Sequence, residues 1–301
     1  MPAGLSAAII AAFVTPFDAA SHLTTVVQPA ADHADLLLVG DSQAQAGCAD
    51  GRWRTLDWGK IGGRERLIPG AAGDCSVGAL VQTTVLAWDR DKVQGAPHWG
   101  EFWDVAKLPG KRGLRRGVRD NLEIALLADG VAPADVYATL RGDQGVERAF
   151  RKLDQLKPYV VWWESEDDAL RLLTSGDVLL TSAPANAVLP PRVVASHLIA
   201  VQWAGGIETM RSWVIPTAAP HVAAAMRFLS FITDPKVSRG LANTGPWGPT
   251  SVGALDGLPA DKLWPTPTAP ANLAAGLTVD ESFWHDNEAR LGKLYDAWMA
   301  K

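Results

Sequence analysis

The sequence predicts an α/β protein, because strand-like and helix-like segments alternate along most of the chain. The first expected strand is Ala34–Val39, a continuous apolar run with one acid that opens into the polar loop Gly40-Asp41-Ser42. Such loops follow the carboxyl ends of strands, where open α/β sheets bind their ligands. A second strand is expected over Gly78–Trp88.

The same alternation continues to the end of the chain. A short helix from Trp99 to Gly110 has its aromatic residues on one side, and Val146–Leu156 has the spacing of an amphipathic helix. Further helices are expected over Asn121–Ala128, Asp168–Leu173, His221–Ile232, Lys236–Ala242 and Ser282–Met299. Further strands are expected over Tyr159–Trp163, Val178–Leu180, Ile199–Trp203 and Trp213–Ile215. Six prolines between Pro246 and Pro270 predict mostly irregular chain before the last helix.

The apolar run Leu5–Val14 is about half as long as a membrane span needs to be. We expect it to be part of a folded helix that continues through Phe17. No Lys or Arg precedes Arg52, so the run lacks the positive flank of a secretory signal. If the protein is exported, we expect its signal peptide to be absent from this sequence.

Length and charge narrow the class of protein. The 301 residues are enough for two domains of roughly 100–200 residues each. A formal charge of -5 gives no broad basic field, so nucleic acid is not an expected partner. One basic cluster, Lys111, Arg112, Arg115 and Arg116, lacks interleaved aromatic residues, and we interpret it as a solvated loop.

Tryptophan and cysteine usage leave alternatives open. Thirteen Trp stand against three Tyr and seven Phe, and each ring either fills a core or lines a ligand cleft. Cys48 and Cys75 could form one bridge in an oxidising compartment or remain two free thiols. With no CxxC pair and no HxxxH spacing, we expect no structural zinc and no other cofactor.

A set of stretches spread over nearly the whole chain from about residue 35 forms one ordered pattern. Its members are Leu56–Ile61, Ile68–Gly70, Asp74–Gly78, Phe102–Val105, Pro109–Gly117, Asn121–Gly130, Leu156–Pro158, Val161–Glu164, Ala223–Lys236, Gly245–Thr250 and Ser282–Asn287. In order and spacing they resemble the type II periplasmic solute-binding proteins of ABC importers (extracellular solute-binding protein family 1). Within that group the likeness is to the spermidine/putrescine-binding branch.

The resemblance implies a two-lobed fold of the type II periplasmic-binding-protein class, with a mixed sheet flanked by helices in each lobe and crossover strands as hinge. Lobe 1 would comprise residues 1–88 and 214–260, and lobe 2 residues 89–213 and 261–301. A small polar solute, polyamine-like or a related amine or amino-acid derivative, would bind in the cleft and favour the closed form.

The resemblance also implies partners and a covalent link. The closed form would dock, as a monomer in the periplasm, on the membrane permease of the transporter. Similar sequences carry Cys in the stretches equivalent to those around Cys48 and Cys75, so the likeness implies a disulfide between them.

The pattern departs from a polyamine site in several places. Relatives have an aromatic residue where Thr181–Asn186 stands here, and an acid at about the position of Arg211. Arginine would repel a polyamine and would suit a carboxylate or phosphate. An opening strand and loop before Ser6 and a helical stretch between Val27 and Ala34 are also missing, which leaves three explanations: altered specificity, a truncation, or loss of the ligand.

Candidate ligand contacts are the hydroxyls, charged groups and rings expected to face the cleft. They are Ser42, Ser76, Arg119, Asp120, Asn121, Glu164, Ser165, Thr181, Glu208, Arg211, Trp247 and Trp284. The alternative for both serines is an ordinary loop position, and for Glu164 and Ser165 a solvated helix start. At the start of the Asn121 helix, the alternative is N-capping by Asp120 or Asn121. For Glu208 and Arg211 the alternative is a salt bridge between them across one turn, and for the two Trp it is core packing.

The rival class is a carbohydrate hydrolase with paired carboxylates from Glu164, Glu166, Asp167 and Asp168, and with Trp rings for sugar stacking. Three of these acids are contiguous and expected to project into water, and no second carboxylate is paired with them at a defined distance. The sequence has no GxSxG, Walker or dinucleotide-binding motif. We therefore expect a binding protein that is not an enzyme.

Overall fold

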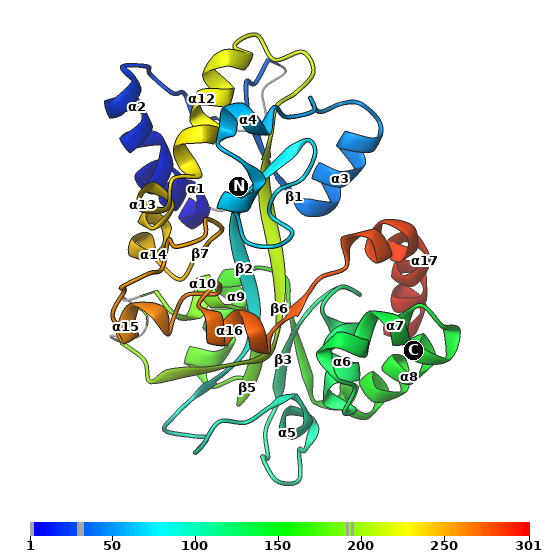
Figure 1. Cartoon of the computed structure of the whole chain (residues 1–301). Coiled ribbons are helices and arrows are strands. Elements are labelled where there is room, and N and C mark those ends of the chain that lie inside the picture. The colour runs from blue at the N-terminus through cyan, green and yellow to red at the C-terminus, as the bar shows by residue number, and fades with distance from the viewer. Residues whose placement is uncertain (1–2, 29–32, 191–192, 194–195) are drawn as a thin grey trace. The chain divides into compact units, whose positions relative to one another are not determined.

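The structure, a computed structural model, describes residues 3–28, 33–190, 193 and 196–301. Helices and strands alternate over these ranges, which confirms the predicted α/β class (Figure 1). The chain divides into two compact units, and each unit is made of two separate chain segments. Unit 1 comprises Met1–Gln82 and Thr209–Pro270, and unit 2 comprises Thr83–Glu208 and Ala271–Lys301.

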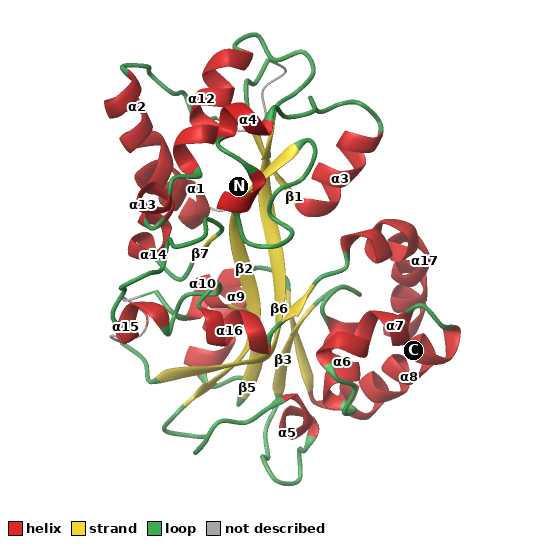
Figure 2. Ribbon diagram, in the orientation of Figure 1, coloured by secondary structure: helices red, strands yellow, loops and turns green. Residues whose placement is uncertain are grey.

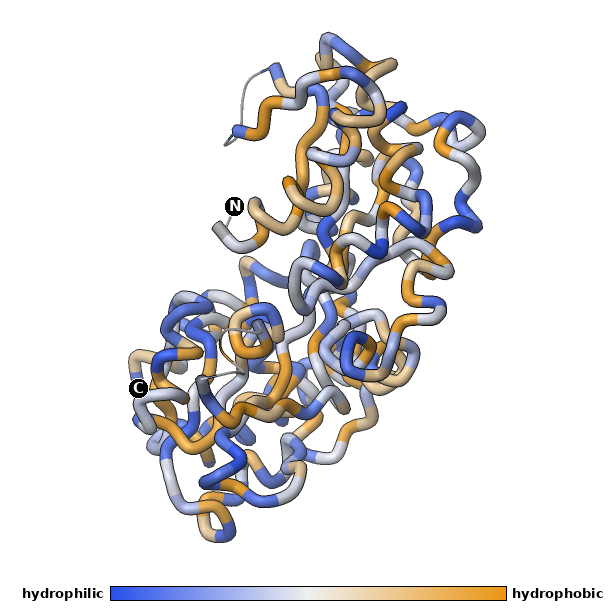
Figure 3. The backbone as a smooth tube through the Cα atoms, turned by 90° about the vertical axis from the view of Figure 1, so that its left-hand side faces the viewer, coloured by the Kyte–Doolittle hydropathy of each residue, from blue (hydrophilic) through white to orange (hydrophobic). Residues whose placement is uncertain are grey.

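Two long strands, β2 (Ser76–Asp89) and β6 (Ile199–Val214), contribute residues to both units (Figure 2). The strand order is β1-β6-β2-β5-β3-β4, with β7 paired to β2 and β8 to β6. Along the chain, hydrophobic and hydrophilic stretches alternate over short distances, as expected for elements that each bury one side (Figure 3).

Unit 1 is a set of helices around the ends of these two strands. Its helices are α1 (Ala3–Ile9), η1 (Ile10–Val14), α2 (Thr15–Ser21), α3 (Asp41–Ala49), α4 (Trp58–Ile61), η2 (Arg64–Arg66), α12 (Val222–Ile232), α13 (Pro235–Ser238), α14 (Gly240–Thr244) and α15 (Ala260–Leu263). The short strand β1 (Leu37–Gly40) pairs antiparallel with the end of β6, and β7 (Gly248–Pro249) pairs antiparallel with β2. Helix α16 (Pro270–Ala275) begins at the last residue of the unit.

The N-terminal helical run is a part of the unit 1 core. Leu5, Ile9, Phe13 and Phe17 are buried and belong to the same apolar cluster as Phe228 of α12. Because the helix continues to the end of α2, the stretch Gly4–Ser21 is long and apolar enough to cross a membrane by length and composition. The prediction of a folded helix through Phe17 is confirmed. The apolar helical stretch, Gly4–Ser21, is longer than the run Leu5–Val14 from which half a membrane span was estimated.

A disulfide joins Cys48, in α3, to Cys75, which precedes β2. The Cα atoms of the pair are 5.6 Å apart, and the two positions are separated by 27 residues. The bridge implied by the family likeness is therefore confirmed. It ties α3, whose first residue follows Gly40 directly, to the start of a long strand of the same unit.

Unit 2 has a sheet with helices on both faces. Strand β5 (Leu180–Pro184) pairs antiparallel with β2, and β3 (Arg112–Arg115) lies parallel to β5 and β4 (Val160–Trp163). Strand β8 (Leu277–Thr278) pairs parallel with β6. The helices are α5 (Trp99–Trp103), α6 (Asn121–Ala128), η3 (Pro133–Asp135), α7 (Val136–Leu140), α8 (Asp143–Leu156), η4 (Lys157–Tyr159), α9 (Glu166–Ser175), α10 (Ala185–Val188) and α17 (Glu281–Met299).

Two apolar clusters lie on opposite faces of the unit 2 sheet. Leu86 and Trp88 of β2 belong to the cluster formed with α6, α8 and α17, while Val85 and Ala87 belong to the cluster formed with α9 and α10. This alternation is the period of two of a strand that is buried on both faces. Helices α6, α7, α8 and α17 group together in Figure 1. Ten of the thirteen Trp are buried, so most of them serve the cores.

Several expected elements differ from the observed ones. The helix predicted from Trp99 to Gly110 ends at Trp103, and the strands predicted over Ile199–Trp203 and Trp213–Ile215 are parts of the single strand β6. The stretch between Val27 and Ala34, where a helical segment is missing from the pattern, includes residues 29–32, which lie outside the described ranges.

The interpretation of the basic cluster as a solvated loop was wrong for Arg112 and for the loop conformation, whereas Lys111, Arg115 and Arg116 are exposed as expected. Residues Arg112–Arg115 form β3, and the Arg112 side chain is fully buried. Its guanidinium donates to the carbonyl oxygens of Phe102 (2.7 Å), Gly110 (2.7 Å) and Leu108 (2.7 Å). Burial lowers the pKa of Arg112 to about 10. The buried cation is accommodated because several backbone oxygens accept its protons.

Candidate functional site

In unit 1 a polar group gathers where β1 ends. Gly40, the last residue of β1, lies opposite Arg211 of β6. The Nε of Arg211 donates to Oε1 of Gln82 on β2 at 3.0 Å, and both side chains are half-buried. Ser42 follows in the first turn of α3 and is half-buried as well. The arrangement presents a guanidinium, an amide and a hydroxyl on neighbouring segments.

Asp41 is the one acid of this unit 1 group. Its Oδ2 accepts a hydrogen bond from Nε2 of Gln45, one turn along α3, at 3.0 Å. Burial raises the pKa of the Asp41 carboxyl above its usual range. The sequence points only to the neighbouring Ser42, although the loop Gly40-Asp41-Ser42 is the signal that could have included Asp41.

In unit 2 the corresponding feature is Asp120, which immediately precedes α6. Its backbone has φ 68° and ψ -41°, a conformation that side-chain-bearing residues rarely adopt. Such strain costs roughly 1–3 kcal/mol and persists where the surroundings enforce it, often at ligand sites. The side chain makes no capping hydrogen bond to α6, so the N-capping alternative is wrong for Asp120.

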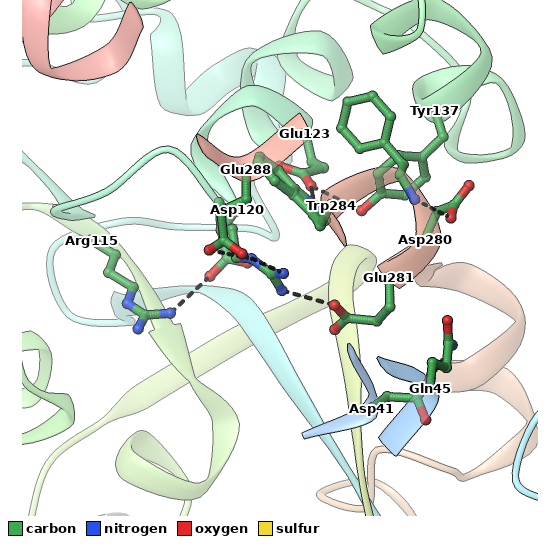
Figure 4. A network of polar contacts seen from close by, with 12 residues as sticks. Asp41, Gln45, Arg115, Asp120, Glu123, Tyr137, Asp280, Glu281, Trp284 and Glu288 are labelled. Carbon is green, nitrogen blue, oxygen red and sulfur yellow. Dashed lines mark hydrogen bonds and ion pairs between the residues drawn. The ribbon is translucent and has the colours of Figure 1, made fainter. Parts of the chain in front are cut away.

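The carboxylate of Asp120 is buried but weakly compensated. Asp120 is 7% exposed, and Thr84 Oγ1 donates to its Oδ2 at 3.4 Å. Nη1 of Arg115 lies 3.9 Å from the same oxygen (Figure 4). Burial raises the pKa of Asp120, and the charges of Arg115 and Arg119 act against that rise. Half of the Arg115 side chain is exposed, so its pairing is screened by solvent.

Asn121 fixes the loop that holds Asp120. Its Nδ2 donates to the carbonyl oxygens of Arg115 (2.7 Å) and Gly117 (2.6 Å), which joins the end of β3 to the start of α6. Asn121 is fully buried, and these contacts give it a structural role that differs from the N-capping alternative.

Arg119 is held within unit 2 by α17. Its Nη1 donates to Oε2 of Glu281 at 2.9 Å, and its Nε and Nη2 donate to the two carboxylate oxygens of Glu288 at 3.1 Å each. The guanidinium carbon also lies 5.2 Å from the ring centroid of Trp284. These contacts turn Arg119 toward α17 and leave Asp120 with the exposed Arg115 as its nearest ion pair.

Glu123, one turn after Asp120, was not among the predicted site residues. It is fully buried, and its Oε1 accepts from the Tyr137 hydroxyl at 2.9 Å and from Trp284 Nε1 at 2.7 Å (Figure 4). Burial and the Asp120 carboxylate raise the pKa of Glu123 to about 7. A single acid inside the apolar run of Asn121–Ala128 is the sequence signal that could have identified it.

Glu208 lies on β6, at the last residue of unit 2 before the chain enters unit 1. Its Oε2 accepts from Thr278 Oγ1 at 3.0 Å, and a Cβ on Gly276 would come within 2.2 Å of its Oε1. Burial raises the pKa of Glu208 to about 7. The alternative for this pair, a Glu208–Arg211 salt bridge across one turn, is wrong, because both residues lie on a strand, where residues three apart point to opposite faces.

The other predicted residues lie elsewhere in their units. Ser76 begins β2, six residues and roughly 20 Å along the strand from Gln82. Glu164 is exposed and 3.5 Å from Arg116, and Ser165 caps α9 through a capping box with Asp168. Thr181 is buried in β5 and bonded to the carbonyl of Gly113.

Trp247 and Trp284 are 5% and 0% exposed, so both pack in cores. This outcome agrees with the core-packing alternative and not with a position in the cleft. Within the described ranges, no group of three or more His, Cys, Asp or Glu side chains lies together in the manner of a metal site.

Replacing Glu208 with Gln should flatten part of the pH dependence of stability. A folded-state pKa of about 7 means that the native state keeps a proton which the unfolded state has lost above its ordinary pKa near 4.5. The free energy of unfolding is therefore highest below pH 4.5 and falls as the pH rises from 4.5 through 7. The fall is roughly 1–3 kcal/mol for such an acid. Urea unfolding at pH 5 and pH 8 measures the difference.

The matched control is Glu65→Gln, which changes an exposed acid of η2. We expect the fall in unfolding free energy between pH 5 and pH 8 to be smaller for Glu208→Gln and unchanged for the control. Equal falls in all three proteins would contradict the assignment of a buried, protonated Glu208.

The chain thus forms two α/β units that share long strands, with polar groups at strand ends and helix starts. The family model of bacterial extracellular solute-binding proteins matches residues 15–271. The chain belongs to this family. It is the substrate-binding component of an ABC transporter, taking a small polar solute and interacting with a membrane permease. The family is extracellular, which indicates a periplasmic location, and the relatives are binding proteins.

Individual relatives agree with this assignment. A gamma-aminobutyric acid-binding protein of Pseudomonas aeruginosa is 37% identical over 268 residues, which is 89% of this chain and 76% of the relative. An ABC transporter substrate-binding protein from Bradyrhizobium japonicum USDA 110 superposes with a TM-score of 0.88 at 26% identity, covering 99% and 97% of the two chains.

A structure from the branch named by the sequence pattern is also similar. The spermidine/putrescine substrate-binding protein PotD of Streptococcus pneumoniae has a TM-score of 0.77 at 15% identity, covering 95% of this chain and 94% of that one. This similarity shows the shared two-lobed fold. The prediction of an ABC solute-binding protein is confirmed.

Proposed function

We propose that the chain captures a zwitterionic amine, an ω-amino acid whose ammonium and carboxylate groups are separated by a short chain, and that it catalyses no reaction. The observation that carries this proposal is the opposite charge of the two polar groups: Arg211 in unit 1 and Asp120 in unit 2. We infer that the two units are the two lobes of the family fold.

The unit 1 group suits a carboxylate. A guanidinium offers donors in a planar fork that matches the two oxygens of a carboxylate. Gln82 accepts from Nε of Arg211 and thereby orients the guanidinium plane. The hydroxyl of Ser42 and the amides at the start of the nine-residue helix α3 add donors for a negative charge.

The unit 2 group suits an ammonium ion. Asp120 is nearly buried, and a buried carboxylate is costly unless a cation or good donors compensate it. The only close donors that the described residues show for it are Thr84 at 3.4 Å and Arg115 at 3.9 Å. A ligand ammonium would supply the missing charge-assisted hydrogen bond.

The relatives support the same ligand class. The ligand in the name of the Pseudomonas aeruginosa relative, gamma-aminobutyric acid, carries one ammonium and one carboxylate. An arginine at position 211 is also the feature that separates this sequence from a polyamine site.

A second candidate ligand is a diamine, and Asp41 is the observation that favours it. Asp41 and Asp120 would then each take one ammonium group, in unit 1 and unit 2 respectively. Like-charge repulsion from Arg211 and the Gln45 contact of Asp41 favour the zwitterion instead.

Thermal unfolding with a panel of compounds tests the proposal. The panel comprises 4-aminobutanoate and its shorter and longer homologues, putrescine, spermidine, α-amino acids and simple carboxylates. A ligand at 100 times its Kd adds about 2.7 kcal/mol to the stability of the protein that binds it. We expect a rise in Tm with the ω-amino acids, recovered unchanged by mass spectrometry, and its loss in Asp120→Asn.

The panel separates the alternatives. A rise with putrescine alone, abolished by Asp41→Asn, would replace the zwitterion by the diamine. Conversion of a compound into a product would contradict the absence of catalysis, and a rise with simple carboxylates that survives Asp120→Asn would contradict the role of Asp120.

A further inference from the structure

Glu123 has one carboxylate oxygen that is bonded and one that is not. Its Oε1 accepts from Tyr137 and Trp284, whereas its Oε2 is buried and has no hydrogen-bond partner among the described residues. Both donors to Oε1 are neutral groups, a phenol and an indole. A buried carboxyl placed in this way either carries a proton on Oε2 or bears a charge that nothing around it neutralises.

The groups that face Glu123 come from the start of α6 and from the helices packed against α6. Asp120 precedes it by one turn, Tyr137 comes from α7, and Trp284 comes from α17, which also carries Glu281 and Glu288. Arg119 is paired with those two acids. Helices α5 and α8 present apolar residues to α6, and the charged Arg148 and Lys152 of α8 bind Asp129, which follows the far end of α6.

The two acids at the start of α6 are therefore coupled. An ionised Asp120 opposes ionisation of Glu123, and no cation faces Glu123 directly among the groups named above. A positive charge brought to Asp120 from outside would reverse this balance, because it would stabilise negative charge on both carboxyls.

We propose that ligand binding is linked to the release of a proton from Glu123: the ammonium group taken by Asp120 replaces the proton that Glu123 carries in the free protein. This inference rests on the proposed function, specifically on an ammonium at Asp120. In the step, the O–H bond at Oε2 breaks, the electron pair stays on the carboxylate, and the proton passes to solvent. One positive charge enters the site and one leaves it.

The pH range of the linkage follows from the position of Glu123. With a pKa of about 7, the side chain is protonated at pH 6 and largely ionised at pH 8 in the free protein. An ω-amino acid keeps both of its charges over this range. While one proton is released per ligand, Kd falls by about tenfold per pH unit, so most of the gain comes between pH 6 and pH 7.

Calorimetric titration with 4-aminobutanoate tests the linkage. Heats measured in phosphate and in imidazole, which both buffer over this range and differ in ionisation enthalpy, give the number of protons released per ligand at pH 6, 7 and 8. We expect well over half a proton to be released at pH 6, little at pH 8, and none at any pH by Glu123→Gln. The control Glu147→Gln, at an exposed position of α8, should release protons as the unchanged protein does.

A second variant keeps the test sharp if Glu123→Gln does not fold. Tyr137→Phe removes one donor to Oε1 and should move the midpoint of proton release to higher pH. Binding without proton release, or equal release by Glu123→Gln, would overturn the inference and leave the ligand class intact. Absence of binding by every ω-amino acid would overturn the proposed function and this inference with it.

Discussion

Replacing Arg211 with Met should weaken the binding of ω-amino acids by a factor of about 30 to several thousand. Removing one partner of a buried, hydrogen-bonded charge pair costs roughly 2–5 kcal/mol of binding free energy. Methionine keeps the length and the apolar stem of the side chain but offers no donor to a carboxylate. Calorimetric titration with 4-aminobutanoate gives the two dissociation constants directly.

The structure offers a matched control for this change. Arg227 on α12 is an exposed arginine of the same unit, so Arg227→Met alters the net charge equally without touching the polar group around Gly40. It should leave Kd within about twofold. Arg211→Asp should in turn favour diamines over ω-amino acids. An unchanged ligand profile in Arg211→Met and Arg211→Asp would remove Arg211 from the site.

Reduction of the Cys48–Cys75 disulfide should lower the stability of unit 1 by about 3 kcal/mol, as a loop of this length predicts. For a unit of this size that corresponds to a fall in Tm of roughly 6–12 °C. The bridge anchors α3, whose first turn carries Asp41 and Ser42, so reduction should weaken ligand binding as well.

Unfolding with and without a phosphine reductant measures this effect. A protein with Ser at both positions should start from the lower Tm and show no response to the reductant. Denatured protein that has not been reduced should contain no titratable thiol, as both cysteines are bridged. Two thiols in that sample would refute the bridge.

Elements with a strong local pattern could be predicted from the sequence. Helix α6 begins and ends where its apolar run does, at Asn121 and Ala128, and the last helix differs from its prediction by one residue at its start. The middle of β6 could not be recognised, because Gly205, Gly206 and Glu208 interrupt its apolar pattern. That strand is held by pairing with its neighbours, which local sequence does not reveal.

The error at β3 has a similar physical origin. A run with several arginines is usually solvated, and nothing in the sequence shows that backbone oxygens from Phe102 to Gly110 surround the guanidinium of Arg112. Burial of a cation depends on acceptors that the tertiary structure brings together, so composition alone predicts the wrong environment.

The candidate site could be predicted in part. The sequence identifies Arg211 through its departure from a family pattern and Asp120 through its place before a helix. It does not show that Arg119 turns to α17, or that Glu123 lies against Tyr137 and Trp284, since those contacts join positions far apart in the chain. Gln82 and Asp41 are equally ordinary in sequence and acquire their roles from strand pairing.

The pairing of Arg119 with Glu281 has a consequence for synthesis. The two residues are 162 positions apart, so at roughly 5–20 residues per second the ribosome needs roughly 10–30 s to make the second after the first. During that interval Asp120 lies next to Arg119 in the nascent chain, and Arg119 does not yet have Glu281 as its partner. The acid that is proposed to recognise the ligand can reach its finished state only when α17 has been made, and a chain that lacks this helix should not compete for solute.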